Sequence, residues 1–147
     1  MNYIVRLEET FADAESVNFI LEYLPGNSLY WVMINQYAMK LGKDDSKWWI
    51  KFYASQILCA LETLQRYNII YRDVKPENMM IDSEGFLKMI DFGFAKILHP
   101  QNQYRTTTNC GTVGYTAPER LVGLSGGYSF PVDVWSFGIL LCELIGG

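Results

Sequence analysis

The sequence predicts an α+β fold in which a strand-rich beginning is followed by a mainly helical part. Three observations lead to this prediction: two β-rich runs lie within the first 23 residues, a second pair surrounds residues 83–85, and two longer segments have helical spacing. Apolar residues three and four positions apart indicate an amphipathic helix, whereas short β-branched and aromatic runs between turn residues indicate strands. The length of 147 residues is that of about one domain.

The composition indicates a globular chain. Hydrophobic residues make up 50% of it, charged residues 19% and aromatic residues 15%, which is far from the polar, highly charged composition of a disordered segment. The net charge of −4 and the pI of about 4.9 argue against non-specific binding to nucleic acid or to an anionic membrane. We therefore expect no nucleic-acid partner, whereas basic partners are compatible with this charge.

The sequence has no stretch with the features of a signal peptide or a membrane span. Residues 1–9 lack an apolar core, and the most apolar run, residues 135–145, is too short for a bilayer and contains Glu143. That run predicts a buried helix. The three cysteines are far apart, and their spacing matches neither a zinc site nor a disulfide framework. We therefore expect a reducing compartment and a cytoplasmic protein.

The first elements are predicted to be a hairpin and a short helix. Residues 3–7 and 17–23 are β-rich runs separated by the polar segment ADAES, as in two strands joined by a loop. The PGN segment then stops the second strand. Either Asn27 or Ser28 can cap a helix through residues 29–34, because the side-chain oxygen of such a residue accepts a hydrogen bond from the first helical turn.

A long amphipathic helix is predicted next, ending near Asn68. It follows three capping candidates at residues 44–46, and we expect it to bury one of Trp48 and Trp49 and to expose the other. The apolar residues at helical spacing are Trp49, Phe52, Tyr53, Ile57, Ala60, Leu61 and Leu64.

The remaining elements are a second hairpin, a long loop and a last helix. The runs MMID and FLKMID flank the turn SEG and predict a hairpin, which we expect to project Asn78 and Asp91 from opposite ends. Residues 93–117 are polar with little periodicity, and such long loops are usually functional or disordered. A helical pattern resumes over residues 132–147.

A dense cluster of charge occupies residues 69–82, IIYRDVKPENMMID, between apolar runs. Transfer of a terminal phosphoryl group from a nucleotide to a hydroxyl requires a carboxylate that orients and deprotonates the acceptor, cations that offset phosphate charge, and ligands for magnesium. Magnesium takes few, hard oxygen ligands, and Asp91 and the amide oxygen of Asn78 suit that role. The cluster therefore points to phosphoryl transfer.

Three ordered motifs carry a resemblance to a known family. YRDVKPEN at 71–78, DFG at 91–93 and APE at 117–119 resemble the catalytic loop, magnesium loop and activation-segment end of eukaryotic protein kinases. Tyr in the usual His place, DFGFAK and CGTVGYTAPE are most similar to the AGC group, especially the cyclic-nucleotide-dependent Ser/Thr kinases. The resemblance implies an incomplete protein-kinase-like fold, with residues 1–23 as the end of the small lobe and 24–147 as hinge and large lobe through its central helix.

The resemblance implies that ATP and Mg²⁺ are used, and it assigns roles to the charged cluster. Asp73 would be the catalytic base and Lys75 the cation near the transferred phosphoryl group, while Asn78 and Asp91 would bind magnesium. The other ATP-binding residues would be the gatekeeper Leu21, hinge residues Glu22 and Leu24, and Met80 below the adenine. A stack anchored by Asp133 would consist of Leu7, Tyr71 and Phe92.

The resemblance also implies a phosphate pocket on the activation loop. Arg72 and Lys96 would bind a phosphate carried by Thr108, with Thr106 and Thr107 as competing positions. A phosphate brings a charge of nearly −2 and can fix a loop through charge-assisted hydrogen bonds to arginine.

Substrate contacts follow from the same resemblance. Thr112 would face the substrate beside Asp73, and Glu77 and Glu143 would receive an arginine near the phosphorylated residue. Ser28 departs from the family pattern, which has a glutamate there. The implied partners are therefore basic protein substrates, together with a cyclic-nucleotide-binding regulatory domain or subunit.

Parts of the kinase machinery have no counterpart in these 147 residues. Upstream of Tyr3 there is no Gly-rich phosphate loop, no strand lysine and no helix glutamate to pair with it. We expect a fragment of a longer Ser/Thr kinase, because every catalytic-loop residue is intact. The alternative is a non-catalytic, pseudokinase-like binding or scaffolding module.

Overall fold

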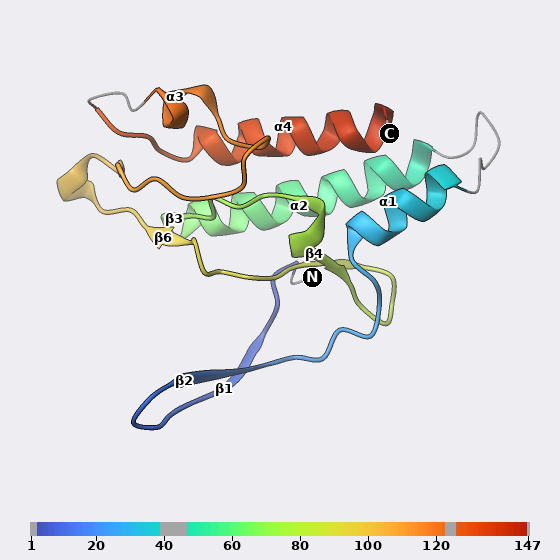
Figure 1. The fold of residues 1–147 in the computed structure, drawn as a ribbon, viewed down its shortest axis with the longest axis horizontal. Helices are drawn as coiled ribbons and strands as arrows, with labels where there is room; N and C mark the ends of the chain where they lie inside the picture. The colour runs from blue at the N-terminus through green and yellow to red at the C-terminus, as the bar shows by residue number, and fades with distance from the viewer. Residues whose placement is uncertain (1–2, 39–46, 123–125, 147) are drawn as a thin grey trace.

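A computed structural model describes residues 3–38, 47–122 and 126–146 of the chain (Figure 1). It confirms the α+β class, with three two-stranded antiparallel sheets beside two long helices. In chain order the elements are β1 (Leu7–Ala12), β2 (Val17–Leu21), α1 (Leu29–Ala38), α2 (Lys47–Arg66), β3 (Ile69–Ile70), η1 (Pro76–Asn78), β4 (Met79–Ile81), β5 (Leu87–Met89), β6 (Lys96–Ile97), η2 (Pro100–Asn102), α3 (Pro118–Leu121) and α4 (Pro131–Gly146).

The predicted first hairpin is present as β1–β2, but its first strand was placed too early. The strand covers residues 7–12 instead of 3–7, and Ala12 pairs with Val17. The turn sets this register, because Asp13 Oδ1 accepts hydrogen bonds from the backbone amides of Glu15 and Ser16. Both faces of β1 are exposed, so its glutamates do not prevent it from being a strand.

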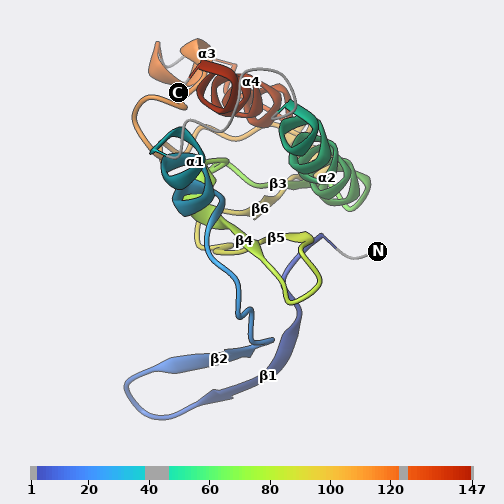
Figure 2. The ribbon, with the colours of Figure 1, turned by 90° about the vertical axis from the view of Figure 1, so that its right-hand side faces the viewer.

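Residues 3–5 have another role: they lie along β5. Met89 donates its amide hydrogen to the Tyr3 carbonyl at 2.8 Å, and Val5 donates to the Met89 carbonyl at 2.9 Å. This connection joins the hairpin to the rest of the molecule, and Figure 2 shows the hairpin projecting away from the helices.

Ser28 is the residue that caps α1. Its Oγ accepts a hydrogen bond from the Trp31 amide at 3.2 Å, which decides between the two predicted candidates. The preceding chain lies against β4, where the Gly26 amide donates to the Ile81 carbonyl at 3.1 Å. A Cβ at Gly26 would lie 2.2 Å from that same oxygen, so the close approach requires glycine.

The long helix α2 confirms its predicted spacing and ends at Arg66, near Asn68. Trp49 is buried and Trp48 is exposed, as expected for neighbours on a helix with one apolar face. The capping candidates at 44–46 lie outside the described residues.

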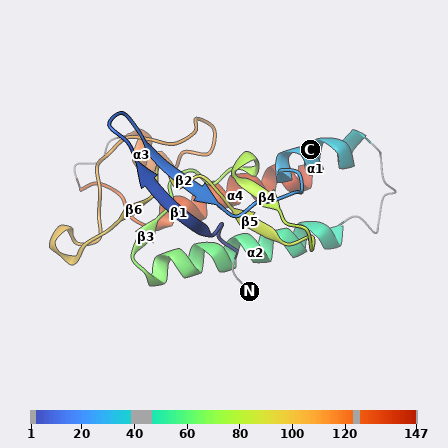
Figure 3. The ribbon, with the colours of Figure 1, turned by 90° about the horizontal axis from the view of Figure 1, so that it is seen from below.

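The core lies between α2, α4 and the β4–β5 hairpin, with α2 running beside α4 (Figures 1 and 3). The predicted burial of the last helix holds for one face: Phe137, Leu140 and Leu144 are buried, whereas Trp135 and Ile145 are exposed. Among the described residues, no helix combines the length and the apolar composition that a membrane crossing requires.

The stretch predicted as a long unstructured loop contains short ordered pieces. β6 pairs with β3, and Thr106 forms an isolated antiparallel bridge with Tyr128. Two-residue strands are too short to show alternation in a sequence, so periodicity could not find them. A second small core forms here, which consists of Ile70, Leu98, Ala117, Tyr128 and Val132.

Candidate active site

The β4–β5 hairpin brings Asn78 and Asp91 to the same end, and the prediction that they project from opposite ends is wrong. Met79 pairs with Met89, and the Ile90 amide donates to the Asn78 carbonyl at 2.9 Å. Both residues therefore lie at the open end of the hairpin, away from its turn. An antiparallel pair places the residue before one strand beside the residue after the other.

The predicted catalytic loop, residues 71–78, is held by the carboxylate of Asp133 at the start of α4. Its two oxygens accept hydrogen bonds from the amides of Tyr71 and Arg72, at 2.8 and 2.7 Å. Arg72 has a φ of 72°, a conformation rare for a non-glycine residue, and these bonds help to maintain it. Burial raises the pKa of Asp133 to about 6, although the two amides and the positive charges of Arg120 and Arg72 oppose this rise.

Asp73 is the centre of the polar cluster. Its Oδ1 accepts a hydrogen bond from Thr112 Oγ1 at 2.6 Å, and its Oδ2 accepts from Asn78 Nδ2 at 2.8 Å and pairs with Lys75 Nζ at 2.9 Å. Burial raises the pKa of this carboxyl, but the bonds from Lys75, Thr112 and Asn78 outweigh it, so the pKa lies below its ordinary value. Asp73 is therefore ionised at neutral pH.

Lys75 and Thr112 complete a triangle with Asp73. Lys75 Nζ donates to Thr112 Oγ1 at 3.0 Å, while the same hydroxyl donates to Asp73. A buried, deprotonated carboxylate next to a fixed cation is an arrangement that can accept a proton from a hydroxyl and offset developing negative charge. The predicted catalytic pair, Asp73 and Lys75, is thus brought together.

The predicted magnesium ligands have suitable chemistry. Asp91 is exposed and has a φ of 57°, and its Oδ1 accepts the amide hydrogen bond of Gly93 at 3.0 Å. Within the described part of the chain, no group of three His, Cys, Asp or Glu side chains is placed to hold a metal ion. One carboxylate and one amide oxygen still fit magnesium, which binds through one or two carboxylates together with substrate phosphates and water.

An apolar cavity of about 630 Å³ lies between the β1–β2 hairpin and the magnesium-loop sequence. Leu7, Leu21, Asp91 and Phe92 line it, so the predicted gatekeeper and one predicted metal ligand meet there. Three predicted adenine contacts do not line it: Glu22, Leu24 and Met80.

Glu22, a predicted hinge residue, is fixed by its own hydrogen bonds. Its carboxylate accepts from the Arg6 amide at 2.8 Å and from Lys88 Nζ at 3.0 Å, and its amide donates to the Arg6 carbonyl at 3.0 Å. In the predicted stack, Tyr71 and Phe92 contact each other edge to face with ring centres 5.3 Å apart, and the Tyr71 hydroxyl donates to the Ile90 carbonyl. Leu7 is half exposed at the edge of the cavity.

The predicted phosphate pocket is only partly assembled around Thr108. Lys96 Nζ donates to Thr106 Oγ1 at 3.0 Å, and Thr106 is buried, whereas Thr107 and Thr108 are exposed. Arg72 donates to the Phe94 carbonyl and, at 3.0 Å, to the Tyr128 hydroxyl.

Tyr128 links this arginine to the threonine segment. Its hydroxyl donates to the Thr108 carbonyl, so Arg72 reaches Thr108 through Tyr128. Sequence reasoning missed this tyrosine, because nothing in its neighbours GGYSF signals a contact with residues 20 positions earlier.

The predicted acidic pair for substrate has an unforeseen neighbour. The Tyr115 hydroxyl donates to Glu143, and Glu77 is exposed nearby. Burial raises the pKa of Tyr115, and the hydrogen bond to Glu143 and the charges of Glu143 and Glu77 raise it further. The charges of both carboxylates therefore act on one phenol, although the two residues are far apart in sequence.

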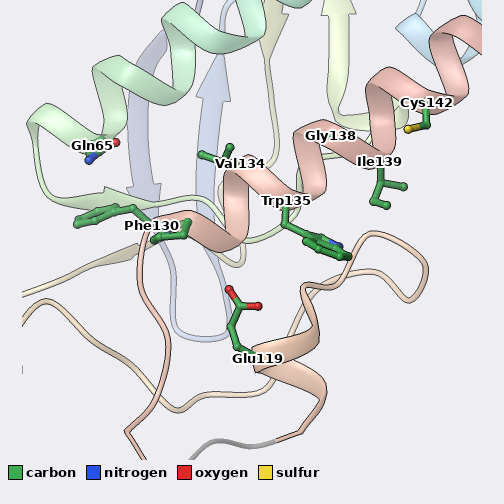
Figure 4. Close-up of a pocket in the computed structure, with 9 residues that line it drawn as sticks. Gln65, Glu119, Phe130, Val134, Trp135, Gly138, Ile139 and Cys142 are labelled. Atoms are coloured by element: carbon green, nitrogen blue, oxygen red, sulfur yellow. The ribbon is translucent and has the colours of Figure 1, made fainter.

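A larger apolar groove lies elsewhere. It has a volume of about 970 Å³ and is formed by α4, Gln65 of α2 and Glu119 of α3. Figure 4 shows Glu119 facing α4 beside Val134 and Trp135. None of the residues of the polar cluster lines this groove, so the cluster and the groove are separate features.

The comparison with protein families agrees with this geometry. The model described as "Protein kinase domain" matches residues 1–147. The chain belongs to the protein kinase family. The alignment with curated kinases covers 99% of the chain in each of three relatives, so the similarity is not restricted to the short motifs.

These relatives include cyclic-nucleotide-dependent kinases. Human cAMP-dependent protein kinase catalytic subunit PRKX is 40% identical, the cGMP-dependent protein kinase of Plasmodium berghei 41%, and the serine/threonine-protein kinase YPK1 of Saccharomyces cerevisiae 37%. The predicted resemblance to this part of the AGC group is therefore confirmed. The chain spans 37%, 16% and 20% of these proteins, respectively.

Proposed function

We propose that the protein is a Ser/Thr protein kinase that transfers the γ-phosphoryl group of ATP to Ser or Thr hydroxyls of protein substrates. The observation that supports this most is the buried cluster in which Lys75, Asn78 and Thr112 all contact the carboxylate of Asp73. These contacts hold an ionised carboxylate beside a cation, as the transfer of a phosphoryl group to a hydroxyl requires. The names of the similar proteins support the same reaction.

In this proposal Asp73 accepts the proton of the substrate hydroxyl as its oxygen attacks the γ-phosphorus of ATP. The bond between that phosphorus and the bridging oxygen breaks, and ADP leaves. Lys75, which lies 2.9 Å from Asp73, offsets the negative charge on the transferred group. Asn78 and Thr112 fix the direction of the Asp73 carboxylate, so it reaches the hydroxyl without reorganising.

Asn78 and Asp91 are proposed to hold Mg²⁺. When bound, this ion neutralises phosphate charge and orients the phosphates for transfer. Leu21, Glu22, Leu24 and Met80 are proposed to surround the nucleotide base. In the same proposal, residues 1–23 end a small lobe, and residues 24–147 form the hinge and the large lobe through its central helix.

The proposed substrates carry arginine near the acceptor residue. The negative charges of Glu77 and of the Tyr115-bonded Glu143 both act on Tyr115, and the net charge of −4 suits basic partners. Regulation by a phosphate on Thr108 belongs to the proposal, because Thr108 is exposed and connects to Arg72 through Tyr128, whereas Thr106 is buried and bonded to Lys96. A cyclic-nucleotide-binding domain or subunit and a cytoplasmic location are further expectations.

The decisive experiment measures transfer from ATP to an arginine-containing peptide by the full-length gene product with and without Mg²⁺. Asp73→Asn is expected to reduce kcat by about 10²- to 10⁴-fold, because it removes the proton acceptor. Asp91→Ala should lower the rate of phosphoryl transfer, and added Mg²⁺ should restore that rate only partly. Asp13→Asn, in the distant hairpin turn, is the matched control and should leave the rate unchanged.

The result that overturns the proposal is a folded wild-type protein without transfer above the Asp73→Asn variant. That outcome would favour the alternative, a non-catalytic binding module. Phosphopeptide mapping of the active protein tests the regulatory part, since phosphate on Thr107 and none on Thr108 would contradict it.

A further inference from the structure

Arg120 in α3 is a buried cation outside the catalytic cluster. Its exposed fraction is 6%, and its guanidinium lies 5.1 Å from the ring centre of Tyr128. Its Nε finds no hydrogen-bond partner among the residues that the structure describes. Burying a charged group with an unsatisfied donor costs free energy. The contacts of the other guanidinium nitrogens should therefore explain why Arg120 is buried here.

The guanidinium bridges two segments. Nη1 donates to the carbonyl of Arg72 at 3.3 Å, and Nη2 donates to Cys110 Sγ at 3.7 Å. Arg72 belongs to the predicted catalytic loop, and Cys110 lies two residues before Thr112. One planar guanidinium group thus connects the backbone next to Asp73 with the segment next to Thr112.

Gly111 shows how closely these two segments approach. It has a φ of 97°, and a Cβ there would lie 2.6 Å from the Arg72 carbonyl oxygen and 2.9 Å from Arg120 Nη2. The backbone at Gly111 therefore packs closely against both the Arg72 carbonyl and the guanidinium. The next residue, Thr112, makes the 2.6 Å hydrogen bond to Asp73.

We propose that Arg120 is a positioning residue that clamps the Cys110–Gly111 segment against the catalytic loop and so sets the place of Thr112 on Asp73. This inference rests on the proposed function. The clamp acts through Thr112. In this proposal Arg120 itself does not contact Asp73, ATP or the acceptor hydroxyl. An aliphatic side chain could fill the same space against Tyr128, but it could not donate to both segments.

The kinetic test is a double-mutant cycle on the full-length gene product. Arg120→Leu is expected to lower kcat for the peptide about 10-fold, as for the loss of one or two buried hydrogen bonds, while KM for ATP changes less than about 2-fold. Arg120→Leu combined with Thr112→Val should be within about 2-fold of Thr112→Val alone, because one contact cannot be lost twice. If instead the fold-losses in kcat of the two single variants multiply in the double variant, the proposal is overturned.

A second measurement does not depend on activity. Hydrogen–deuterium exchange of the amides in residues 108–113 should become about 10-fold faster in Arg120→Leu, because the clamp no longer closes that segment. Arg66→Leu is the matched control: Arg66 is an exposed arginine that pairs with Glu62 on α2, and its loss should leave both exchange and kcat unchanged.

The two measurements separate the two proposals. Wild-type protein without transfer, but with faster exchange in Arg120→Leu, would reject the kinase function and support the clamp. Unchanged exchange at 108–113 would reject the clamp whatever the activity. If Arg120→Leu does not fold, Arg120→Gln, which retains an N–H donor, replaces it in both experiments, with smaller changes expected in the same direction.

Discussion

The predicted catalytic loop, residues 71–78, and the β1–β2 hairpin reverse the usual distribution of polar and apolar residues. In the loop Asp73 is 4% exposed and Asn78 6%, whereas in the hairpin Val17 and Phe19 are each 64% exposed. Charged side chains are seldom buried unless paired, and large apolar ones usually contribute to a core. The loop therefore buries polar side chains, and the hairpin exposes apolar ones.

Hydrogen bonding explains the difference. Each buried polar group of the loop has several partners, and the carboxylate of Asp133 binds two loop amides. The hairpin is a two-stranded sheet that projects away from the helices in the described part of the chain, so its apolar side chains have little to pack against (Figures 1 and 2). In this molecule the polar loop around Asp73 is therefore part of the folded core, whereas the apolar side chains of the β1–β2 hairpin lie outside it.

Among changes to the polar loop and the residues that support it, the largest effect on stability is expected from Asp133→Ala. It leaves the amides of Tyr71 and Arg72 buried without acceptors and should lower the free energy of unfolding by about 2–5 kcal/mol. Asp13→Ala, at the hairpin turn, should cost less than about 1 kcal/mol, because its bonds are exposed. Urea denaturation measures the free energy of unfolding of both variants. Equal losses would show that the loop and the hairpin do not differ in how much they contribute to stability.

A pH titration with Asp133→Asn sharpens the same point. The pKa of Asp133 is raised to about 6, so its folded form binds a proton more tightly than its unfolded form does. The wild type should therefore lose stability relative to the Asn variant as pH rises from 4 to 7, by up to about 3 kcal/mol. A relative gain over that window would show that Asp133 is less buried than its contacts indicate.

Lys75→Met tests whether the buried loop is arranged for chemistry. Losing a charged hydrogen bond to Asp73 should reduce kcat of the full-length gene product by about 10- to 100-fold. The pKa of Asp73, now below its ordinary value, should rise, so activity on the acid side should disappear at a higher pH than in the wild type. Lys51→Met, on the exposed face of α2, should match the wild type in rate and pH profile.

Local patterns in the sequence predicted most of the fold. The apolar spacing of α2 and the turn between β4 and β5 are local, so both elements could be placed to within a few residues. The first strand was misplaced because its position depends on the Asp13 turn, and its alternation is weak when both faces are exposed.

The candidate site was predicted as a set of motifs, but the contacts among its parts were not. Tyr115 meets Glu143 across 28 positions, Tyr128 meets Arg72 across 56, and Arg120 meets Arg72 across 48. No short pattern encodes such pairs. The placement of Asn78 beside Asp91 was misjudged for a related reason, since strand pairing decides which end of a hairpin a flanking residue occupies.

The smallest effect is expected from Phe11→Ala in β1 of the 147-residue chain. Phe11 is 53% exposed and pairs with Asn18, so its removal should change the free energy of unfolding by less than about 1 kcal/mol. Phe137→Ala, the same change in the core face of α4, should cost about 3–5 kcal/mol. Light scattering should show weaker association for Phe11→Ala, because an exposed apolar strand favours it. If instead the two variants lose equal stability, the hairpin packs as part of the core, and the division of this chain into a hydrogen-bonded polar loop and an unpacked apolar hairpin is wrong.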